Sequence, residues 1–395
     1  MKTLPLVIVT LLLMALAAPQ TVGATDTSSE GAGERPAAPA TAAVPQGRRL
    51  RDIVAEKYPG GNVFIGATLG SPQIKAPGVD LEILNREFSY TTPENDFKQS
   101  TVHPLPGDVW HWEKCDLYLK NCVQNRQVVR IHGPISPQVS KWGKDDARTA
   151  PEMKQMLVEY LTALYTRYND HPAVRWVDVV NETASGGGGW FGPKPGTEEW
   201  ENPWTILGSD TDENQTPLYI RDAFELAAKH ATKLKLVFNQ HMDDRAAMEK
   251  VKKTILYLRA NGLRVDALGW QAHVNLGWEK LPGKVEYMSQ LIAWAHENKL
   301  EFHVTENNVA LPKMPEPDEE ELAAGTFAAI MRLLLEHRDT GVVAWNCWHV
   351  RDYLVREKVR TALLFAEDGS PNKSYYAIQH LLENPPPAAQ SQAVK

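Results

Sequence analysis

The chain is poor in cysteine, since its 395 residues include only Cys115, Cys122 and Cys347. An odd number leaves at least one thiol free or paired between chains. Cys115 and Cys122 fall in a segment that reads as a helix, where two turns separate them by about 10 Å, too far for a disulfide. We therefore expect three buried free thiols, and their spacing matches no zinc site.

Clusters of basic residues are also absent. The chain has 42 Lys and Arg against 49 Asp and Glu, a net charge of -7. A phosphate-binding face needs concentrated positive charge, so the composition argues against a nucleic-acid partner. Tryptophan, in contrast, is frequent at 12 residues. That number fits either a large core or sugar rings stacking on aromatic side chains.

Long apolar runs are missing after the N-terminus. Met1-Lys2 is followed by an apolar run over residues 4–18 and by the small-x-small end Val22-Gly23-Ala24. This pattern is typical of a secretory signal peptide, and we place the cleavage after Ala24. The run is short for a membrane span of about 20 residues. We expect residues 1–24 to be removed and the protein to be secreted or periplasmic.

Both flanks of the remaining chain have the composition of disordered segments. Residues 25–47 and 384–395 are rich in Ala, Pro, Ser and Thr or Gln and show no apolar period, which predicts a linker and a tail. Residues 48–383 form one continuous globular stretch with no second linker and no internal repeat. Its length fits a single barrel domain of about 250 residues or more with extra segments.

Short apolar runs alternate with amphipathic helical patterns along this stretch. We expect buried strands at 63–67, 88–92, 128–131, 174–180, 234–238, 267–271, 302–305 and 342–345, and helices at 150–168, 219–230, 248–261, 285–298 and 319–337. Alternation of this kind predicts parallel strands joined by crossover helices. Seven or eight such units predict an α/β fold closed into a (β/α)8 TIM barrel.

Polar residues follow at least five of the predicted strands. In a barrel of this type the working residues lie at the C-terminal ends of the strands. One polar residue after a buried strand has little weight, but several on one rim predict a site. The residues concerned are Glu94, Asn95, Lys98, His132, Asn181, Glu182, Gln271, His273 and Glu306.

Glu182 and Glu306 carry most of the chemical argument. Hydrolysis of a glycosidic bond needs two carboxyl groups that flank it, about 5 to 5.5 Å apart in retaining enzymes. Two strand ends that face each other across a barrel mouth can deliver that separation. For either Glu alone, a solvated loop position or a salt bridge is the usual explanation. Because both follow strands, we predict that they form the catalytic pair.

At these residues the sequence resembles the glycoside hydrolase family 10 xylanases. The resemblance spans roughly residues 50–382 and keeps the order of the family's motifs. The motifs W-D-x-V-N-E, I-T-E-L-D, T-x-E-N-x-x-K and G-L-Q-S-H correspond here to Trp176 to Glu182, Val304 to Asn308, Thr92 to Lys98 and Gly269 to His273. A closing phrase like L-L-F followed by P-K-P-A-Y corresponds to residues 363–377.

The resemblance implies a retaining, endo-acting hydrolase that cuts β-1,4-linked xylan through a covalent glycosyl-enzyme intermediate. Glu182 would be the general acid/base and Glu306 the nucleophile. The glycone side of the cleft would be lined by Glu94, Asn95, Lys98, His132, Asn181, Gln271, His273 and Trp345. Asn181 would bind the 2-hydroxyl of the sugar, and Trp345 would form the stacking floor. No metal or cofactor is implied, the partner is a polysaccharide, and we expect a monomer.

The third-strand motif departs from the family. The usual H-T-L-V-W-H-x-Q-x-P-x-W reads H-G-P-I-S-P-Q-V-S-K-W at residues 132–142. Ser136 stands where an active-site Trp is expected, and Pro137 where a second His is expected. Asn308 replaces the Asp after the nucleophile, so we expect His273 to be neutral more often. These changes leave the exact glycan open.

Two further segments are unusual. The last strand reads Trp345-Asn-Cys-Trp348-His349 instead of the usual W-G-V-x-D. After Glu182 comes a glycine-rich loop at residues 185–192, followed by more tryptophans including Trp204. Trp190 or Trp204 either stacks on the departing sugar or only covers the rim of the barrel.

Three other functions compete with the xylanase reading. A retaining β-glycosidase of the same fold could act on another polysaccharide. A non-catalytic carbohydrate-binding barrel would predict the loss of a catalytic Glu, yet both are present. A metal-dependent hydrolase is suggested by His132, His273 and His303, but His303 lies three residues before Glu306 on a strand, so alternation places the two on opposite faces.

Overall fold

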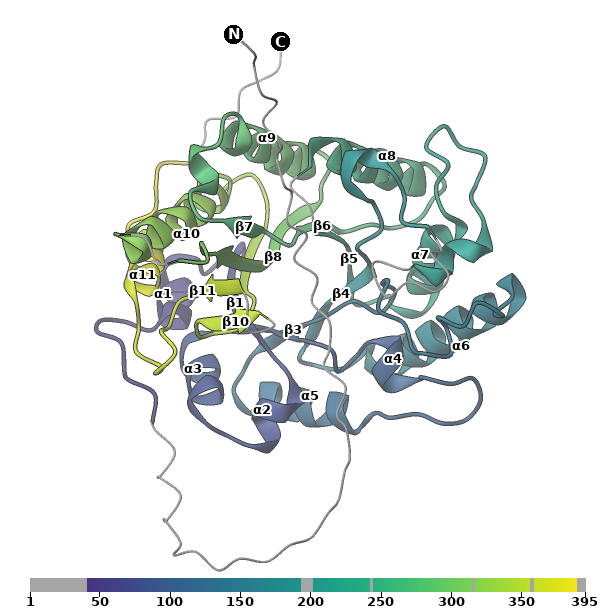
Figure 1. Ribbon diagram of the computed structural model, residues 1–395, viewed down its shortest axis with the longest axis horizontal. Coiled ribbons are helices and arrows are strands. Elements are labelled where there is room, and N and C mark those ends of the chain that lie inside the picture. The colour runs from purple at the N-terminus through teal and green to yellow at the C-terminus, as the bar shows by residue number, and fades with distance from the viewer. Residues whose placement is uncertain (1–40, 193–201, 242–243, 315–316, 356–358, 389–395) are drawn as a thin grey trace, which may run out of the picture. The chain divides into compact units, whose positions relative to one another are not determined.

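The computed structural model describes residues 41–192, 202–241, 244–314, 317–355 and 359–388 (Figure 1). The predicted signal peptide, the linker up to residue 40 and the tail from residue 389 lie outside these ranges. Residues 41–47 and 384–388 contain neither helix nor strand, but the prediction that they are disordered is wrong. The buried Ala42 donates its N–H to Glu82 at 2.9 Å, and the Pro386 carbonyl accepts from Arg338 at 2.9 Å, so both stretches pack on the domain. None of the helices in the described ranges is long and apolar enough to cross a membrane.

Eight parallel strands close into a barrel. They are β1 (Val63–Leu69), β2 (Tyr90–Pro93), β3 (Val128–Ile131), β4 (Val174–Asn181), β5 (Lys235–Gln240), β6 (Ala267–Trp270), β8 (Glu301–Ala310) and β9 (Val343–Cys347). Each pairs in parallel with the next, and β1 pairs with β9 to complete the circle. The predicted (β/α)8 barrel is confirmed, and all eight strands lie where the apolar runs predict them.

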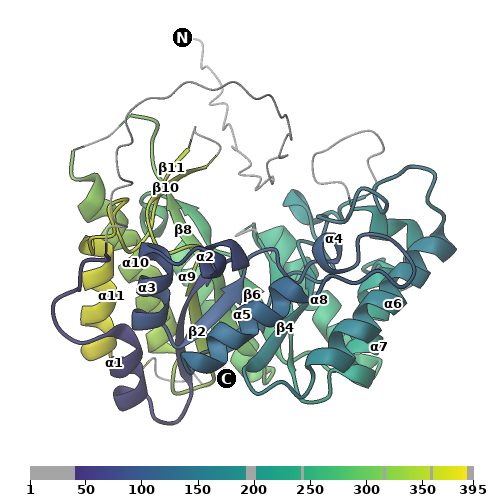
Figure 2. The same ribbon diagram turned by 90° about the horizontal axis from the view of Figure 1, so that it is seen from below.

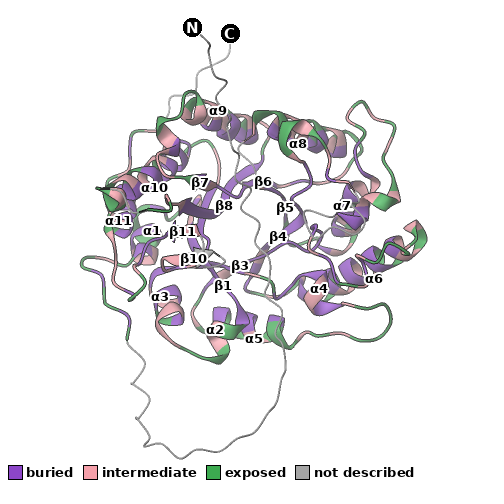
Figure 3. Ribbon diagram, in the orientation of Figure 1, coloured by how far each residue is buried: buried purple, intermediate pink, exposed green. Residues whose placement is uncertain are grey.

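Helices surround the barrel and connect its strands (Figure 1). They are α1 (Leu50–Lys57), α2 (Ser71–Lys75), α3 (Val79–Glu87), α4 (Gln99–Val102), α5 (Glu113–Gln124), α6 (Ala150–Tyr168), α7 (Leu218–His230), α8 (Arg245–Ala260), α9 (Lys284–Glu297), α10 (Glu319–Glu336) and α11 (Lys373–Glu383). The five helices predicted from amphipathic patterns are α6 to α10. Figure 3 shows the strands buried, while each helix of the outer ring has buried and exposed faces.

The ends of the helices follow from local chemistry. Thr149 starts α6 with a capping box, in which its backbone N–H donates to the Glu152 carboxylate at 2.8 Å and its hydroxyl accepts from the Glu152 N–H. Gly262 follows α8 with φ of +78°, a conformation that glycine adopts without strain. Asp318 precedes α10 as predicted, but its side chain makes no capping bond.

Two apolar layers hold the barrel. A small inner cluster of Tyr90, Trp176, Val237, Ala267 and Ala344 fills its interior. A much larger cluster lies between the strands and the helices. All three cysteines are buried and free, as predicted.

Additional strands extend β8 beyond the barrel. β7 (His273–Asn275) runs parallel to the last residues of β8. β10 (Tyr353–Val355) and β11 (Val359–Ala362) form an antiparallel pair, and β11 also pairs with β8. Figure 2 shows β10 and β11 standing above the C-terminal ends of the barrel strands. These strands therefore build a wall beside the mouth that the polar residues occupy.

Candidate active site

Irregular strand geometry turns both predicted carboxylates into the barrel mouth. Thr305 and Glu306 both contact Asn239, at 2.8 and 2.9 Å, although successive side chains of a regular strand point to opposite faces. The β8–β9 register shifts between Val304 and Asn307, which explains the turn. β4 has a comparable shift against β5 just before its end. Glu182 follows that end and has φ of 56°.

Glu306 is held in a strongly positive setting. It is 3% exposed, and its Oε1 accepts a hydrogen bond from Asn239 Nδ2 at 2.9 Å. His132 Nδ1 lies 3.8 Å from Oε1 and His273 Nε2 lies 3.3 Å from Oε2. Burial by itself raises the pKa of the carboxyl, but the two histidines and Arg130 outweigh it and lower the pKa to about 2. Glu306 is therefore an anion at neutral pH.

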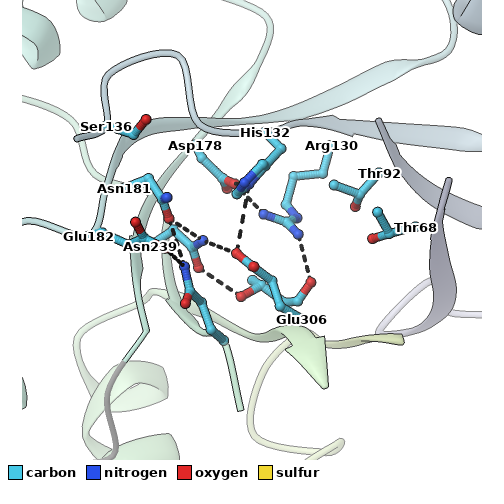
Figure 4. A network of polar contacts seen from close by, with 12 residues as sticks. Thr68, Thr92, Arg130, His132, Ser136, Asp178, Asn181, Glu182, Asn239 and Glu306 are labelled. Atoms are coloured by element: carbon cyan, nitrogen blue, oxygen red, sulfur yellow. Dashed lines mark hydrogen bonds and ion pairs between the residues drawn. The ribbon is translucent and has the colours of Figure 1, made fainter. Parts of the chain in front are cut away.

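A buried ionic cluster lies next to Glu306 and orients His132. Arg130 forms an ion pair with Asp178, and it also donates to the Tyr90 hydroxyl at 2.6 Å and to the Thr305 carbonyl at 2.8 Å. Asp178 Oδ2 lies 2.9 Å from His132 Nδ1. Figure 4 shows Glu306 between Arg130 and the end of β4. The sequence reasoning missed Arg130 and Asp178, although a charge inside an apolar strand is itself a signal.

Glu182 is held between two amide groups. It is 7% exposed, and Gln271 Nε2 donates to its Oε1 while Gln138 Nε2 donates to its Oε2, both at 3.0 Å. The carbonyl oxygen of Gln138 accepts from Lys98 Nζ and from the Ser136 hydroxyl, both at 3.2 Å. Gln138 thus fixes the carboxyl while Lys98 and Ser136 fix Gln138. Gln138 is not among the site residues predicted from the sequence.

Amide groups connect the two carboxylates. Asn181 Oδ1 accepts from Asn239 Nδ2 at 2.7 Å and from Gln271 Nε2 at 3.1 Å, and these two donors also bind Glu306 and Glu182 respectively. Asn181 Nδ2 is buried and has no hydrogen-bond partner among the described residues. A buried donor without a partner is costly, so it is available to a bound molecule. Asn239 is a second member of the site that sequence reasoning missed.

His273 contacts the residue that replaces the family's aspartate. Its Nδ1 lies 3.0 Å from Asn308 Oδ1. Burial lowers the pKa of the imidazole, but the hydrogen bond and the charge of Glu306 raise it more, so the net pKa lies above the ordinary value. The structure therefore does not favour the neutral His273 that the Asn308 substitution suggested, because Glu306 supplies the negative charge.

The role predicted for Trp345 is wrong. Its side chain is 1% exposed and packs edge-on against Phe327 of α10, with ring centroids 6.2 Å apart. The neighbouring Ala344 faces the inside of the barrel. Strand alternation therefore sends Trp345 outward, between the barrel and the helix.

Trp348 takes the place at the mouth. Its ring lies 5.1 Å from that of His132 and 6.2 Å from that of His273. The family pattern W-G-V-x-D is therefore matched by Trp348-His-Val-Arg-Asp352, three residues later than the sequence analysis placed it. His349 stands in the glycine position of that pattern.

The other predicted residues differ in how tightly they are held. Lys98 is 7% exposed. The charges of Glu182 and Glu306 raise the pKa of its ammonium group, but burial lowers this pKa by more. Glu94 is half-buried and Asn95 is exposed. Within the described ranges neither has a side-chain hydrogen bond, so both are free to bind a ligand.

The loop after Glu182 covers the rim. Trp204 in the short helix η2 (Pro203–Leu207) is fully buried and donates its indole N–H to the Ser136 carbonyl at 3.1 Å. The Trp190 indole N–H donates to the Asn214 carbonyl at 3.0 Å. Both contacts favour a rim-covering role for these tryptophans.

The three histidines considered as metal ligands do not come together. No group of three His, Cys, Asp or Glu side chains there is arranged to hold a metal ion. His303 does not join His132 and His273, because its Nε2 lies 3.1 Å from Glu301, whose carboxylate also accepts from the Trp176 indole inside the barrel.

Comparison with known proteins gives consistent results. The family model described as Glycosyl hydrolase family 10 matches residues 54–381. Endo-1,4-beta-xylanase A of Caldicellulosiruptor saccharolyticus is 26% identical over 339 residues, covering 80% of this chain and 92% of that protein. Endo-1,4-beta-xylanase A of Humicola insolens is 25% identical, covering 84% and 86%. The crystal structure of xylanase 10B from Thermotoga petrophila in complex with xylobiose has a TM-score of 0.73 at 24% identity, covering 87% and 99%.

Proposed function

Because the chain belongs to glycosyl hydrolase family 10, we propose that it is a retaining endo-1,4-β-xylanase with Glu306 as nucleophile and Glu182 as general acid/base. The observation that carries the role assignment is the contrast between the two carboxyl groups. Glu306 lies against two imidazoles that keep it ionised, whereas both hydrogen bonds to the Glu182 carboxyl come from neutral amides. A nucleophile needs the first setting, and a group that both gives and takes a proton is suited by the second.

The first chemical step forms the covalent intermediate. A Glu306 oxygen attacks the anomeric carbon, the bond from that carbon to the glycosidic oxygen breaks, and Glu182 gives its proton to the leaving oxygen. Asn239 hydrogen-bonds to the attacking carboxylate at 2.9 Å and fixes its orientation before the reaction. Less conformational entropy of the Glu306 side chain is then lost in the transition state.

The second step releases the sugar. Glu182, now ionised, removes a proton from a water molecule, and the water oxygen attacks the anomeric carbon as the bond to Glu306 breaks. Two displacements on the same carbon leave the product with the β configuration of the substrate. Gln138 and Gln271 keep Glu182 in place for both roles.

The polar rim supplies the substrate contacts. We assign the 2-hydroxyl of the reacting sugar to the free Nδ2 of Asn181, an interaction that strengthens in the transition state. Trp348 replaces Trp345 as the aromatic wall. The remaining glycone contacts are assigned to Glu94, Asn95, Lys98, His132, Gln271 and His273.

The proposed organisation of the whole chain follows from its sequence. Residues 1–24 direct export to the periplasm or the medium, and residues 48–383 form the catalytic domain. The mature protein acts as a monomer on xylan and uses no cofactor.

A different β-glycan is the second candidate substrate. Ser136 stands where the family has a tryptophan, and its small side chain hydrogen-bonds to Gln138 instead of forming an aromatic wall beside Glu182. Without an aromatic ring at this position, we expect the cleft to accept sugars that carry larger substituents than xylose.

The first experiment is reducing-sugar release by the mature protein on xylan beside a panel of other β-glycans. We expect activity on xylan, loss of at least about a thousandfold in Glu306→Gln, and normal activity in Glu213→Gln, an exposed matched control. Proton NMR of the first product should show the β-anomer. An α-anomer contradicts the double displacement, and activity only on another glycan moves the specificity to the rim around Ser136.

A further inference from the structure

His349 adopts a backbone conformation that its side chain disfavours. Its φ is +81°, in the left-handed region that favours glycine. It follows β9 at the position where the family pattern has glycine, so a residue free of this strain is compatible with the fold. Strained positions of this kind concentrate at functional sites. The occurrence of histidine here, in place of an unstrained glycine, therefore suggests a function for the imidazole.

Of the other non-glycine residues with positive φ, Asp318 is the residue before α10, and the rest divide into two groups. Arg126, Gln215 and Lys299 each donate a backbone hydrogen bond to the carbonyl three residues earlier, so they are turn positions explained by chain reversal. Glu182 and Ala272 lie at the mouth of the barrel, after β4 and β6. His349 follows β9 and belongs with this second group.

The imidazole of His349 stands at the glycone-side rim. Its ring packs edge-on against Tyr353, with centroids 5.0 Å apart, and lies 6.2 Å from the ring of Trp348. The negative charge of Glu94, which follows β2, also acts on the imidazole. Tyr353 is also linked to the nucleophile side, because its hydroxyl accepts from Asn308 at 3.3 Å.

Both ring nitrogens of His349 remain available. In the described part of the chain neither has a hydrogen-bond partner, and neither is sealed from solvent. Burial lowers the pKa of the ring, so at neutral pH it is a neutral imidazole with one donor and one acceptor. Sugar hydroxyls require this combination, since each can both donate and accept.

We propose that His349 is a substrate-binding residue of the glycone half of the cleft, which exchanges a hydrogen bond with a hydroxyl of the β-1,4-linked sugar chain. The inference rests on the proposed function, because the glycone half is defined by the assignment of Glu306. The inference adds to the proposed function a substrate contact that is specific to this chain, at a position where the family pattern has glycine. The imidazole also fills space that glycine leaves open, so it narrows the range of sugar substituents that fit.

The test compares His349→Gly with Lys299→Gly, an exposed position of φ 56° before β8, at the opposite end of the barrel. Each variant is made with and without Glu306→Gln. The readouts are the thermal midpoint and, in the Glu306→Gln background, the dissociation constant for xylotetraose by calorimetry. We expect both glycine variants to raise the midpoint, and only His349→Gly to weaken binding by about three- to tenfold.

His349→Asn provides a rescue, since Asn tolerates left-handed φ and keeps a donor and an acceptor. We expect His349→Asn to bind xylotetraose more tightly than His349→Gly. Its thermal midpoint should not follow the same order as its affinity. Unchanged binding in His349→Gly overturns the proposal. If the parent protein cleaves another glycan instead of xylan, the substrate assignment fails, and the same comparison on an oligomer of that glycan still decides the role of His349.

Discussion

Gln138 links Ser136, which departs from the family pattern, to the acid/base Glu182. Ser136 presents a hydroxyl to the amide of Gln138, and Gln138 reaches Glu182 at 3.0 Å. The Trp204 indole binds the Ser136 carbonyl, so a large aromatic residue supports this loop from behind. Where the family has a tryptophan, this chain therefore has a serine hydroxyl that helps to hold Gln138 against the acid/base.

Replacing Gln138 by Leu keeps the volume and removes that contact. We expect kcat on xylan to fall by about ten- to a hundredfold, part of the 10²- to 10⁴-fold that general acid catalysis supplies. An aryl xylobioside with a nitrophenol leaving group needs little protonation, so its rate should fall much less. Steady-state kinetics on the two substrates measures the difference.

The control is Gln155→Leu on the exposed face of α6, which should alter neither rate. Equal losses of kcat on both substrates in Gln138→Leu would show that Gln138 supports the fold of the cleft and does not position Glu182.

Single residues of the site were predictable to different degrees. The convergence of Glu182, Glu306 and Asn181 was predictable because they lie at the ends of strands with clear apolar runs. The prediction for Trp345 was wrong because the first tryptophan of the last strand does not face the mouth of the barrel. Strand alternation directs its side chain outward, against α10. Gln138 was not predicted because it lies in a loop. Without the periodicity of a helix or strand, the sequence does not indicate which loop side chains point into the site.

At the scale of elements, β5, β6 and β8 meet at Asn239. Its Oδ1 accepts from the Thr305 hydroxyl, which fixes the amide so that Nδ2 points to Asn181 and Glu306. Gly269 of β6 lies against the same amide, and a Cβ built there would be 2.5 Å from Asn239 Oδ1. The absence of a side chain at one position of β6 thus allows β5 and β8 to position the nucleophile.

Gly269→Ala should therefore disturb the nucleophile through Asn239. We expect kcat/KM on xylan to fall by about tenfold or more, because the 2.9 Å bond to Glu306 is lost or lengthened. Overpacking should also lower the free energy of unfolding by about 1–3 kcal/mol. Kinetics and urea unfolding measure the two effects.

Gly325→Ala is the matched control, since Gly325 lies exposed in α10. It should raise the free energy of unfolding by about 0.5–1 kcal/mol and leave kcat/KM unchanged. Full activity in Gly269→Ala would show that Asn239 can move without displacing Glu306.

The main elements were predictable because period and length separate buried strands from amphipathic helices. The added strands were not. β7, β10 and β11 span only three or four residues each and stand outside the strand–helix alternation that locates the equally short β2, β3 and β6 in the sequence. β7 and β11 pair with β8 where it continues past the barrel. Their place beside the mouth follows from tertiary contacts alone.

Closure of the barrel joins the two ends of the domain. β1 and β9 pair along five positions, and near this seam a single buried carboxylate links helices distant in sequence. Glu87 at the end of α3 is 1% exposed and accepts from the Leu50 N–H of α1 at 3.0 Å and from the Tyr375 hydroxyl of α11 at 2.9 Å. It also forms an ion pair with Arg86.

Removing this link should destabilise the whole molecule without touching the chemistry. In Glu87→Ala the three donors lose their acceptor, so we expect the free energy of unfolding to fall by about 3 kcal/mol. Glu87 precedes β2 and thus lies at the end of the barrel opposite the site, so kcat at 25 °C should stay unchanged. Glu56→Ala removes the exposed pair with Arg48 and should cost less than about 1 kcal/mol. Equal costs for both variants in urea unfolding would mean that closure does not depend on Glu87.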